Sequence, residues 1–185
     1  MKDDNLQQSR KTRYTRMVLR DSLAELMKEK SILRISIKDI CERADVSRST
    51  FYAHYKDQYD LLQQIQEETI VNIEKLLEKY NDDISRDGTM RMLEELLRYI
   101  ADNGPSIQGL LSENGDINFQ KKIIGFTRRE EVLKYVTDRF DEKTQEYASV
   151  FMVNGSIGLI QQWFKNNMDV PVSEMVKLFL KITNW

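Results

Sequence analysis

Residues 36–56 have the sequence SIKDICERADVSRSTFYAHYK, and this stretch decides the fold of the N-terminal part of the chain. Its apolar residues recur at helical spacing on both sides of the segment Asp45–Ser47. Ser36 and Ser47 each stand where a helix begins, and serine is a preferred helix-capping residue. We therefore expect two short helices joined by a three-residue turn, which is a helix-turn-helix unit.

Each helix of this unit has an apolar side and a polar side. The first helix is expected to bury one side against its neighbours, with a small residue at the close crossing. The second helix is expected to bury two aromatic rings four residues apart. The residues expected to build the packed side are Ile37, Ile40, Cys41, Ala44, Val46, Phe51 and Tyr55.

Basic residues are concentrated near the start of the chain, although the net charge of the whole protein is −2. Residues 8–56 contain twelve lysines and arginines against six acidic residues, a net charge of +6, so the rest of the chain carries −8. A local positive surface on an acidic protein suits binding to the phosphates of a nucleic acid. A helical surface can also be basic by chance, so the charge alone decides little.

The polar side chains of the unit match groups that bind DNA. Arg48 can donate two hydrogen bonds to O6 and N7 of guanine, while Ser49 and Thr50 suit short contacts to base edges or to a phosphate. The other side chains suit phosphate contacts, which set the register of the protein without selecting a sequence. The expected DNA-binding residues are Ser36, Lys38, Ser47, Arg48, Ser49, Thr50, Tyr52, His54 and Lys56.

The order of residues from Ile37 to Asp57, followed by Leu61 and Leu62, resembles the DNA-binding domain of the TetR family. The tetrapeptide Tyr-Ala-His-Tyr at 52–55 makes the resemblance more specific than a generic helix-turn-helix. The resemblance covers about residues 12–62 and implies a dimeric transcriptional regulator made of helices.

Two residues depart from the family pattern. Asp45 occupies a position that is usually glycine, and aspartate can adopt the left-handed conformation that such a turn needs. Gln58 occupies a position where many members carry a lysine that touches phosphate. We therefore expect Lys56 to take over that contact.

The rest of the chain predicts an all-α protein, because only two prolines and seven glycines interrupt it and no convincing strand is present. We expect a three-helix, helix-turn-helix head over residues 8–56, joined by a long helix to a ligand-binding and dimerisation bundle over residues 57–185. The expected helices cover about residues 12–30, 37–44, 48–54, 57–80, 89–102, 106–111, 118–139, 141–166 and 171–184.

The spacing of Phe151, Gly155, Gly158 and Trp163, followed by the segment Pro171–Met175, resembles the C-terminal domain of regulators related to a dihydroxyacetone kinase activator. In TetR proteins the last two long helices form a four-helix dimer interface, so the resemblance implies the same here. The alternative is that the two glycines pack inside one chain. The expected interface residues are Gly155, Gly158, Met175, Val176, Phe179 and Ile182.

The resemblance implies a dimeric repressor that binds a palindromic operator in double-stranded DNA and is released by a small, apolar effector. Half-sites for such a dimer lie about 34 Å apart. The alternative is an activator or co-regulator whose C-terminal domain binds another protein. The sequence identifies no effector-binding residue.

Other classes of function lack their motifs. His54 is the only histidine and no glycine-rich phosphate loop or Cys/His cluster occurs, so we expect no enzyme, no metal and no cofactor. No apolar run is long enough for a membrane span, and residues 1–8 do not look like a secretory signal. The single Cys41 cannot form an internal disulfide, which favours a cytoplasmic protein.

Overall fold

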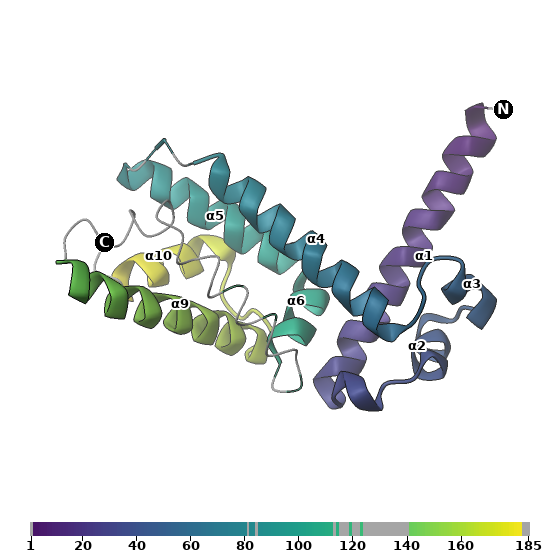
Figure 1. The fold of residues 1–185 in the computed structure, drawn as a ribbon. Coiled ribbons are helices and arrows are strands. Elements are labelled where there is room, and N and C mark those ends of the chain that lie inside the picture. Colours follow the sequence, from purple (N-terminus) through teal and green to yellow (C-terminus); the bar gives the residue numbers. More distant parts are fainter. Residues whose placement is uncertain are drawn as a thin grey trace. The chain divides into compact units, whose positions relative to one another are not determined.

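The computed structural model describes residues 2–80, 82–83, 85–112, 114, 119, 123 and 141–182, and every regular element in these residues is a helix (Figure 1). The expected all-α class is confirmed. The helix expected over residues 118–139 lies outside the described residues. The elements are α1 (Lys2–Glu29), the 3-10 turn η1 (Ile32–Arg34), α2 (Ile37–Ala44), α3 (Arg48–Tyr52), α4 (Gln58–Glu78), α5 (Arg86–Asp102), α6 (Gly104–Leu111), α9 (Glu142–Lys165) and α10 (Val172–Ile182).

The chain forms two compact units. The first unit contains Met1–Glu67 together with Pro105–Asp116, and the second contains Glu68–Gly104 together with Ile117–Trp185. In the described part of the chain, no helix is both long enough and apolar enough to cross a membrane.

The boundaries of two helices differ from the sequence-based expectation by more than two residues. Helix α1 begins at Lys2 instead of Thr12, because the added residues are mostly good helix formers although they carry no apolar stripe to reveal them. Helix α5 begins at Arg86, so the polar loop expected to reach Gly88 ends earlier. Ser85 caps α5 by accepting a hydrogen bond from the backbone N–H of Gly88 at 3.0 Å.

The core of the first unit joins α1 to the helices that follow it. Helix α6 enters this core through Ile107 and Leu110, which are buried. A Cβ atom at Gly109 would lie 2.6 Å from the backbone oxygen of Ala24, so the absence of a side chain lets α6 approach α1 closely. The fully buried side chains contributed by α1 to α4 are Leu19, Leu23, Met27, Ile35, Ile40, Phe51, Leu61 and Ile65.

The second unit packs α10 against α5, and this packing involves part of the expected dimer interface. The side chains of Met175, Val176 and Phe179 are buried within the single chain. The apolar stripe of α10 therefore packs within its own chain, and a contact of these three residues with a partner stays a prediction. Ile182 keeps 58% of its surface exposed.

Candidate nucleic-acid interface

The turn between α2 and α3 has the left-handed residue that the sequence predicts. Asp45 has φ 52° and ψ 48°, and its backbone N–H donates to the carbonyl of Cys41. The N–H of Val46 donates to the same carbonyl at 3.0 Å. Aspartate is one of the few residues other than glycine that tolerate this conformation, so the departure from the family pattern preserves the turn.

The aromatic residues of α3 and of the segment that follows it divide between the core and the surface. Phe51 and Tyr55 are buried, and their ring centroids lie 5.7 Å apart. Tyr52 is 58% exposed, and its ring meets the edge of Phe51 at 5.8 Å. The division predicted for the recognition helix is therefore confirmed, although the contacts of its residues with DNA remain a prediction.

The polar residues of this region lie on the surface to different degrees. Ser36, Lys38, Ser47, Arg48, Ser49, Tyr52 and Lys56 are exposed, whereas Thr50 and His54 are half-buried. Among the residues expected to pack, Ile40, Cys41, Phe51 and Tyr55 are buried, whereas Ile37, Ala44 and Val46 are half-buried. The structure thus brings all nine expected DNA-binding residues to α2, α3 and the segments that flank them.

Three hydroxyl groups gather at the start of α3. The Oγ atom of Ser47 accepts a hydrogen bond from the backbone N–H of Thr50 at 3.1 Å and caps the helix. The same atom lies 2.7 Å from the Oγ of Ser49 and 2.8 Å from the Oγ1 of Thr50. Ser47 therefore has a structural role in addition to its expected contact with DNA, and it orients its two neighbours.

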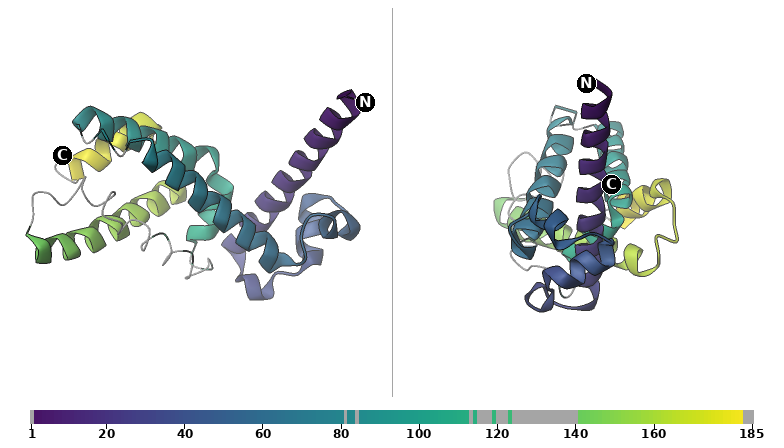
Figure 2. Two further views of the ribbon diagram at one scale, coloured as in Figure 1. Left: turned by 45° about the horizontal axis from the view of Figure 1, so that its top comes forward. Right: turned by 90° about the vertical axis from the view of Figure 1, so that its right-hand side faces the viewer.

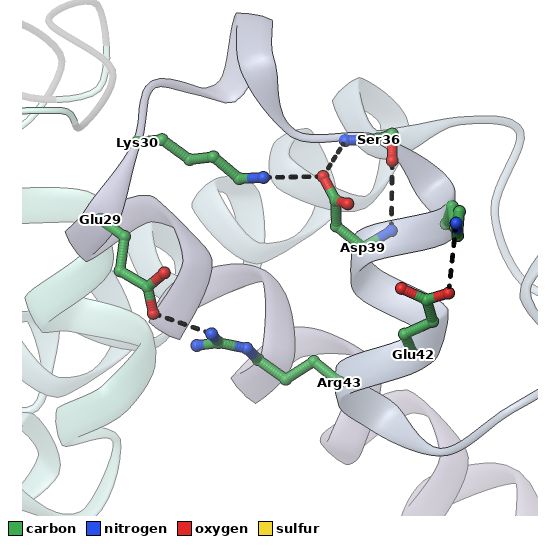
Figure 3. A network of polar contacts seen from close by, with 7 residues as sticks. Glu29, Lys30, Ser36, Asp39, Glu42 and Arg43 are labelled. Carbon is green, nitrogen blue, oxygen red and sulfur yellow. Dashed lines mark hydrogen bonds and ion pairs between the residues drawn. The ribbon is translucent and has the colours of Figure 1, made fainter.

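Helix α2 is held in place by a network of polar contacts (Figure 3). Ser36 and Asp39 form a reciprocal capping box, with hydrogen bonds of 3.2 Å and 3.0 Å. The ammonium of Lys30 lies 2.8 Å from Asp39, and Arg43 pairs with Glu29 at 2.8 Å. The hydrogen bond from Lys30, together with that from the backbone of Ser36, lowers the pKa of Asp39 to about 2.

One expected phosphate contact has a competitor inside the protein. The ammonium of Lys38 lies 3.6 Å from the carboxylate of Glu42, and both side chains are well exposed. An exposed pair of this kind contributes little to stability, so a phosphate can displace Glu42 at small cost.

An open hollow of about 530 Å³ lies between α2 and α3. Cys41 and Arg48 both line it. Burial raises the pKa of the Cys41 thiol, and the guanidinium of Arg48 offsets part of this rise. Cys41 thus acts as a small packing residue, as the sequence predicts. The residues that line the hollow are Lys38, Cys41, Glu42, Asp45, Val46, Ser47 and Arg48.

Sequence reasoning missed a link between α1 and the end of the helix-turn-helix unit of residues 36–56, which we call the recognition unit. The Nε atom of Arg16 donates to the hydroxyl of Tyr55 at 3.4 Å, and its Nη2 donates to Gln64 at 3.3 Å. A charge count over residues 8–56 detects the basic character of this region, but it does not assign each cation to a helix face.

The two glycines expected at a dimer interface have open space beside them within the described part of the chain. Among the described residues, no atom outside their own helix lies within 4 Å of a Cβ built at Gly155 or Gly158. Tyr147 and Phe151 precede them at four-residue steps on α9 and are 67% and 73% exposed. This geometry gives no support to the alternative that the glycines serve close packing inside one chain.

Two family descriptions match separate parts of the sequence. Residues 19–65 match the family described as bacterial regulatory proteins of the tetR family. Residues 87–184 match the family described as the C-terminal region of a transcriptional regulator.

One similar protein and several solved structures agree with these matches. The chain is 30% identical over 94 residues to the HTH-type dhaKLM operon transcriptional activator DhaS of Lactococcus lactis, an alignment that covers 51% of this chain and 47% of the relative. The fatty acid degradation regulator FadR of Bacillus halodurans superposes with a TM-score of 0.67 at 12% identity, over 91% of this chain and 94% of that one. FadR of Bacillus subtilis in complex with stearoyl-CoA superposes with a TM-score of 0.60 at 16% identity, over 90% and 96%.

Proposed function

Since this chain belongs to the TetR family of bacterial transcriptional regulators, we propose that it binds a palindromic operator as a dimer and represses transcription until a small molecule releases it. The observation that carries this proposal is the division of α3, which buries Phe51 and presents Arg48 and Tyr52 to solvent. Such a helix can enter the major groove with its polar side chains toward the bases.

Arg48 is the residue proposed to select a base. It is exposed at the first position of α3, where a recognition helix typically contacts base edges. A bidentate contact with guanine contributes about 1–3 kcal/mol of discrimination against other bases. Lys56 is proposed to contact phosphate, since it is exposed directly after the recognition unit.

The dimer is proposed to form through the exposed face of α9 instead of the apolar stripe of α10. Phe151 and Tyr147 offer large apolar surface, while Gly155 and Gly158 let a partner helix approach closely. Ile182 of α10 is the remaining member of the interface predicted from sequence. A two-fold dimer places its two recognition helices about 34 Å apart, one turn of DNA.

The effector is proposed to be a small, apolar molecule. The similar FadR structure of Bacillus subtilis holds stearoyl-CoA, whose acyl chain is apolar. Release then requires that the effector bind more tightly to a dimer whose heads do not fit the operator. We propose no enzymatic activity and a cytoplasmic location, where the DNA is.

Activation is the second candidate, and one observation favours it. The relative that is 30% identical is named a transcriptional activator. In this alternative the C-terminal unit binds another protein instead of a small molecule. A promoter fused to a reporter distinguishes the two, because deletion of a repressor raises expression whereas deletion of an activator lowers it.

Selection of bound sequences from random DNA tests the proposed DNA binding. We expect a palindrome with half-sites one helical turn apart, and Arg48→Ala should lose affinity mainly for this palindrome. Lys56→Ala should lose about the same affinity for the palindrome and for random duplex. Equal losses on both duplexes for Arg48→Ala would show that Arg48 does not select a base.

A further inference from the structure

Helix α1 extends well past the part that packs in the head. It forms one unbroken helix from Lys2 to Glu29, and its N-terminal half projects beyond α2 and α3 (Figure 2). Residues 10–14 are all exposed, and buried positions follow at Thr15, Leu19 and Leu23. The turn formed by residues 10–14 therefore has another role than building the core.

After Asp3 and Asp4, the projecting part carries cations and no further anions. No acidic residue occurs between positions 5 and 20, whereas five basic residues do. Arg10, Lys11 and Arg13 are exposed, and none of the three forms an ion pair within the described part of the chain. A solvated helix face usually mixes both signs, as α5 does where Arg98 pairs with Glu94. This face instead suits a polyanion.

The basic residues share their side of the helix with a tyrosine. Arg10, Arg13 and Tyr14 are spaced three and four residues apart, so they line one face. Tyr14 is 63% exposed, which leaves its hydroxyl free to donate to a phosphate oxygen. We call Arg10, Lys11, Arg13 and Tyr14 the α1 basic face.

Contacts within the first unit place the α1 basic face near the recognition unit. Arg16 donates to the hydroxyl of Tyr55, which stands between His54 and Lys56 in the sequence. An α-helix rises 1.5 Å per residue, so Arg13 and Arg10 lie about 5 Å and about 9 Å farther along α1 than Arg16. The basic surface therefore continues from the expected phosphate contacts of Lys56 onto α1.

We propose that the α1 basic face is a second DNA contact, which binds the sugar–phosphate backbone beside the base pairs that α3 recognises. This inference rests on the proposed function and adds a site to it. Continuity with the recognition surface and the absence of acidic partners select nucleic acid as the occupant. The contact is independent of sequence, because phosphates carry no base information.

The test compares two variants that each lose three positive charges. In the first variant, Arg10→Gln, Lys11→Gln and Arg13→Gln remove the cations of the α1 basic face. In the control, Lys75→Gln, Lys165→Gln and Lys177→Gln remove three exposed lysines of the second unit. Glutamine forms helices about as well as lysine and arginine, and circular dichroism checks that the helix content is kept.

The affinity for the selected palindrome and for a random duplex is measured by fluorescence anisotropy over about 50–200 mM salt. The plot of log K against log salt falls with a slope whose magnitude is about 0.9 for each phosphate contact. The loss of three contacts should therefore reduce the magnitude of this slope by about 2–3 per head. This reduction in slope should be equal on the palindrome and on the random duplex. Hydroxyl-radical footprints of the palindrome should lose protection next to each half-site.

Three results would overturn the inference. A first variant with the wild-type slope would show that the α1 basic face does not touch DNA. An equal loss of slope in the control variant would show only a general effect of net charge. A wild-type protein that binds neither duplex would refute the proposed function itself, which separates that failure from failure of the α1 contact alone.

Discussion

A single methyl group added at Gly109 tests how closely α6 packs on α1. In Gly109→Ala, the new Cβ would lie 2.6 Å from the backbone oxygen and 2.9 Å from the Cα of Ala24. Both atoms belong to the backbone of α1, so neither can rotate away. The two helices must separate, or α6 must shift along its axis.

The expected loss follows from two opposing effects. Replacing glycine by alanine inside a helix stabilises a protein by about 0.5–1 kcal/mol. Forcing an extra carbon into a packed contact costs about 1–3 kcal/mol. We therefore expect Gly109→Ala to lower the free energy of unfolding by about 1 kcal/mol, within a range of about 0–2.5 kcal/mol, and a loss of 1 kcal/mol corresponds to a fall in Tm of about 2–4 °C for a chain of this size.

Gly104→Ala is the matched control, since it adds the same atom to the same helix. Its Cβ would meet a carbon of Phe164 at 3.6 Å, an ordinary contact. Urea unfolding of both variants, followed by circular dichroism, gives the comparison. If Gly109→Ala proves as stable as Gly104→Ala, then α6 does not lie against the backbone of α1 as described.

Three further predictions concern a pH effect, the turn and the dimer. Lys30 holds the pKa of Asp39 at about 2, below the ordinary 3.8, so the stability that Asp39 contributes is present above about pH 4 and is lost toward pH 2. The variant Asp39→Asn should therefore be less stable than the wild type at pH 7. Urea titrations at several pH values should show this difference in stability shrinking below pH 4. Asp45→Gly should raise the free energy of unfolding by a few tenths of a kcal/mol. Asp45→Val should lower it by about 1–2 kcal/mol, because valine is strained at positive φ. Equal stability of the two variants would contradict the left-handed turn. Phe151→Ser should weaken the dimer at least about tenfold in sedimentation equilibrium, as truncation of a buried aromatic at an interface does, and an unchanged dimer would exclude this face of α9.

The recognition unit could be predicted almost completely from the sequence. Ser36, Asp45 and Ser47 mark its helix boundaries by residue types with specific backbone roles. Phe51 and Tyr55 lie four residues apart, so helical periodicity alone assigns them to the same buried side. Local rules were sufficient because the unit is short and each of its turns has one dominant signal.

The interface on the C-terminal helices could not be predicted in the same way. An apolar stripe shows that one side of a helix is buried, but it does not say which chain buries it. Met175, Val176 and Phe179 pack in their own chain, whereas Gly155 and Gly158 face open space. Tertiary packing of α10 against α5 makes this distinction, and a pattern within one helix does not contain it.

The N-terminal half of α1 was missed for a different reason. Periodicity detects a helix by its buried side, and residues 10–14, which precede the first buried position at Thr15, are all exposed. Their helical state follows from residue propensity and from continuation of the packed part of α1. A helical segment that packs against nothing is therefore recognised in a sequence by its pattern of charged residues and not by an apolar stripe.

The cluster of hydroxyl groups around Ser47 has a consequence for the tolerance of the operator. Ser49 and Thr50 are already oriented by Ser47, so they lose little rotational entropy when DNA arrives. A hydroxyl can also reverse the direction of its proton without moving its oxygen, and it then accepts where it had donated. We expect the base pairs beneath Ser49 and Thr50 to vary among natural operators, whereas the base pair beneath Arg48 stays constant.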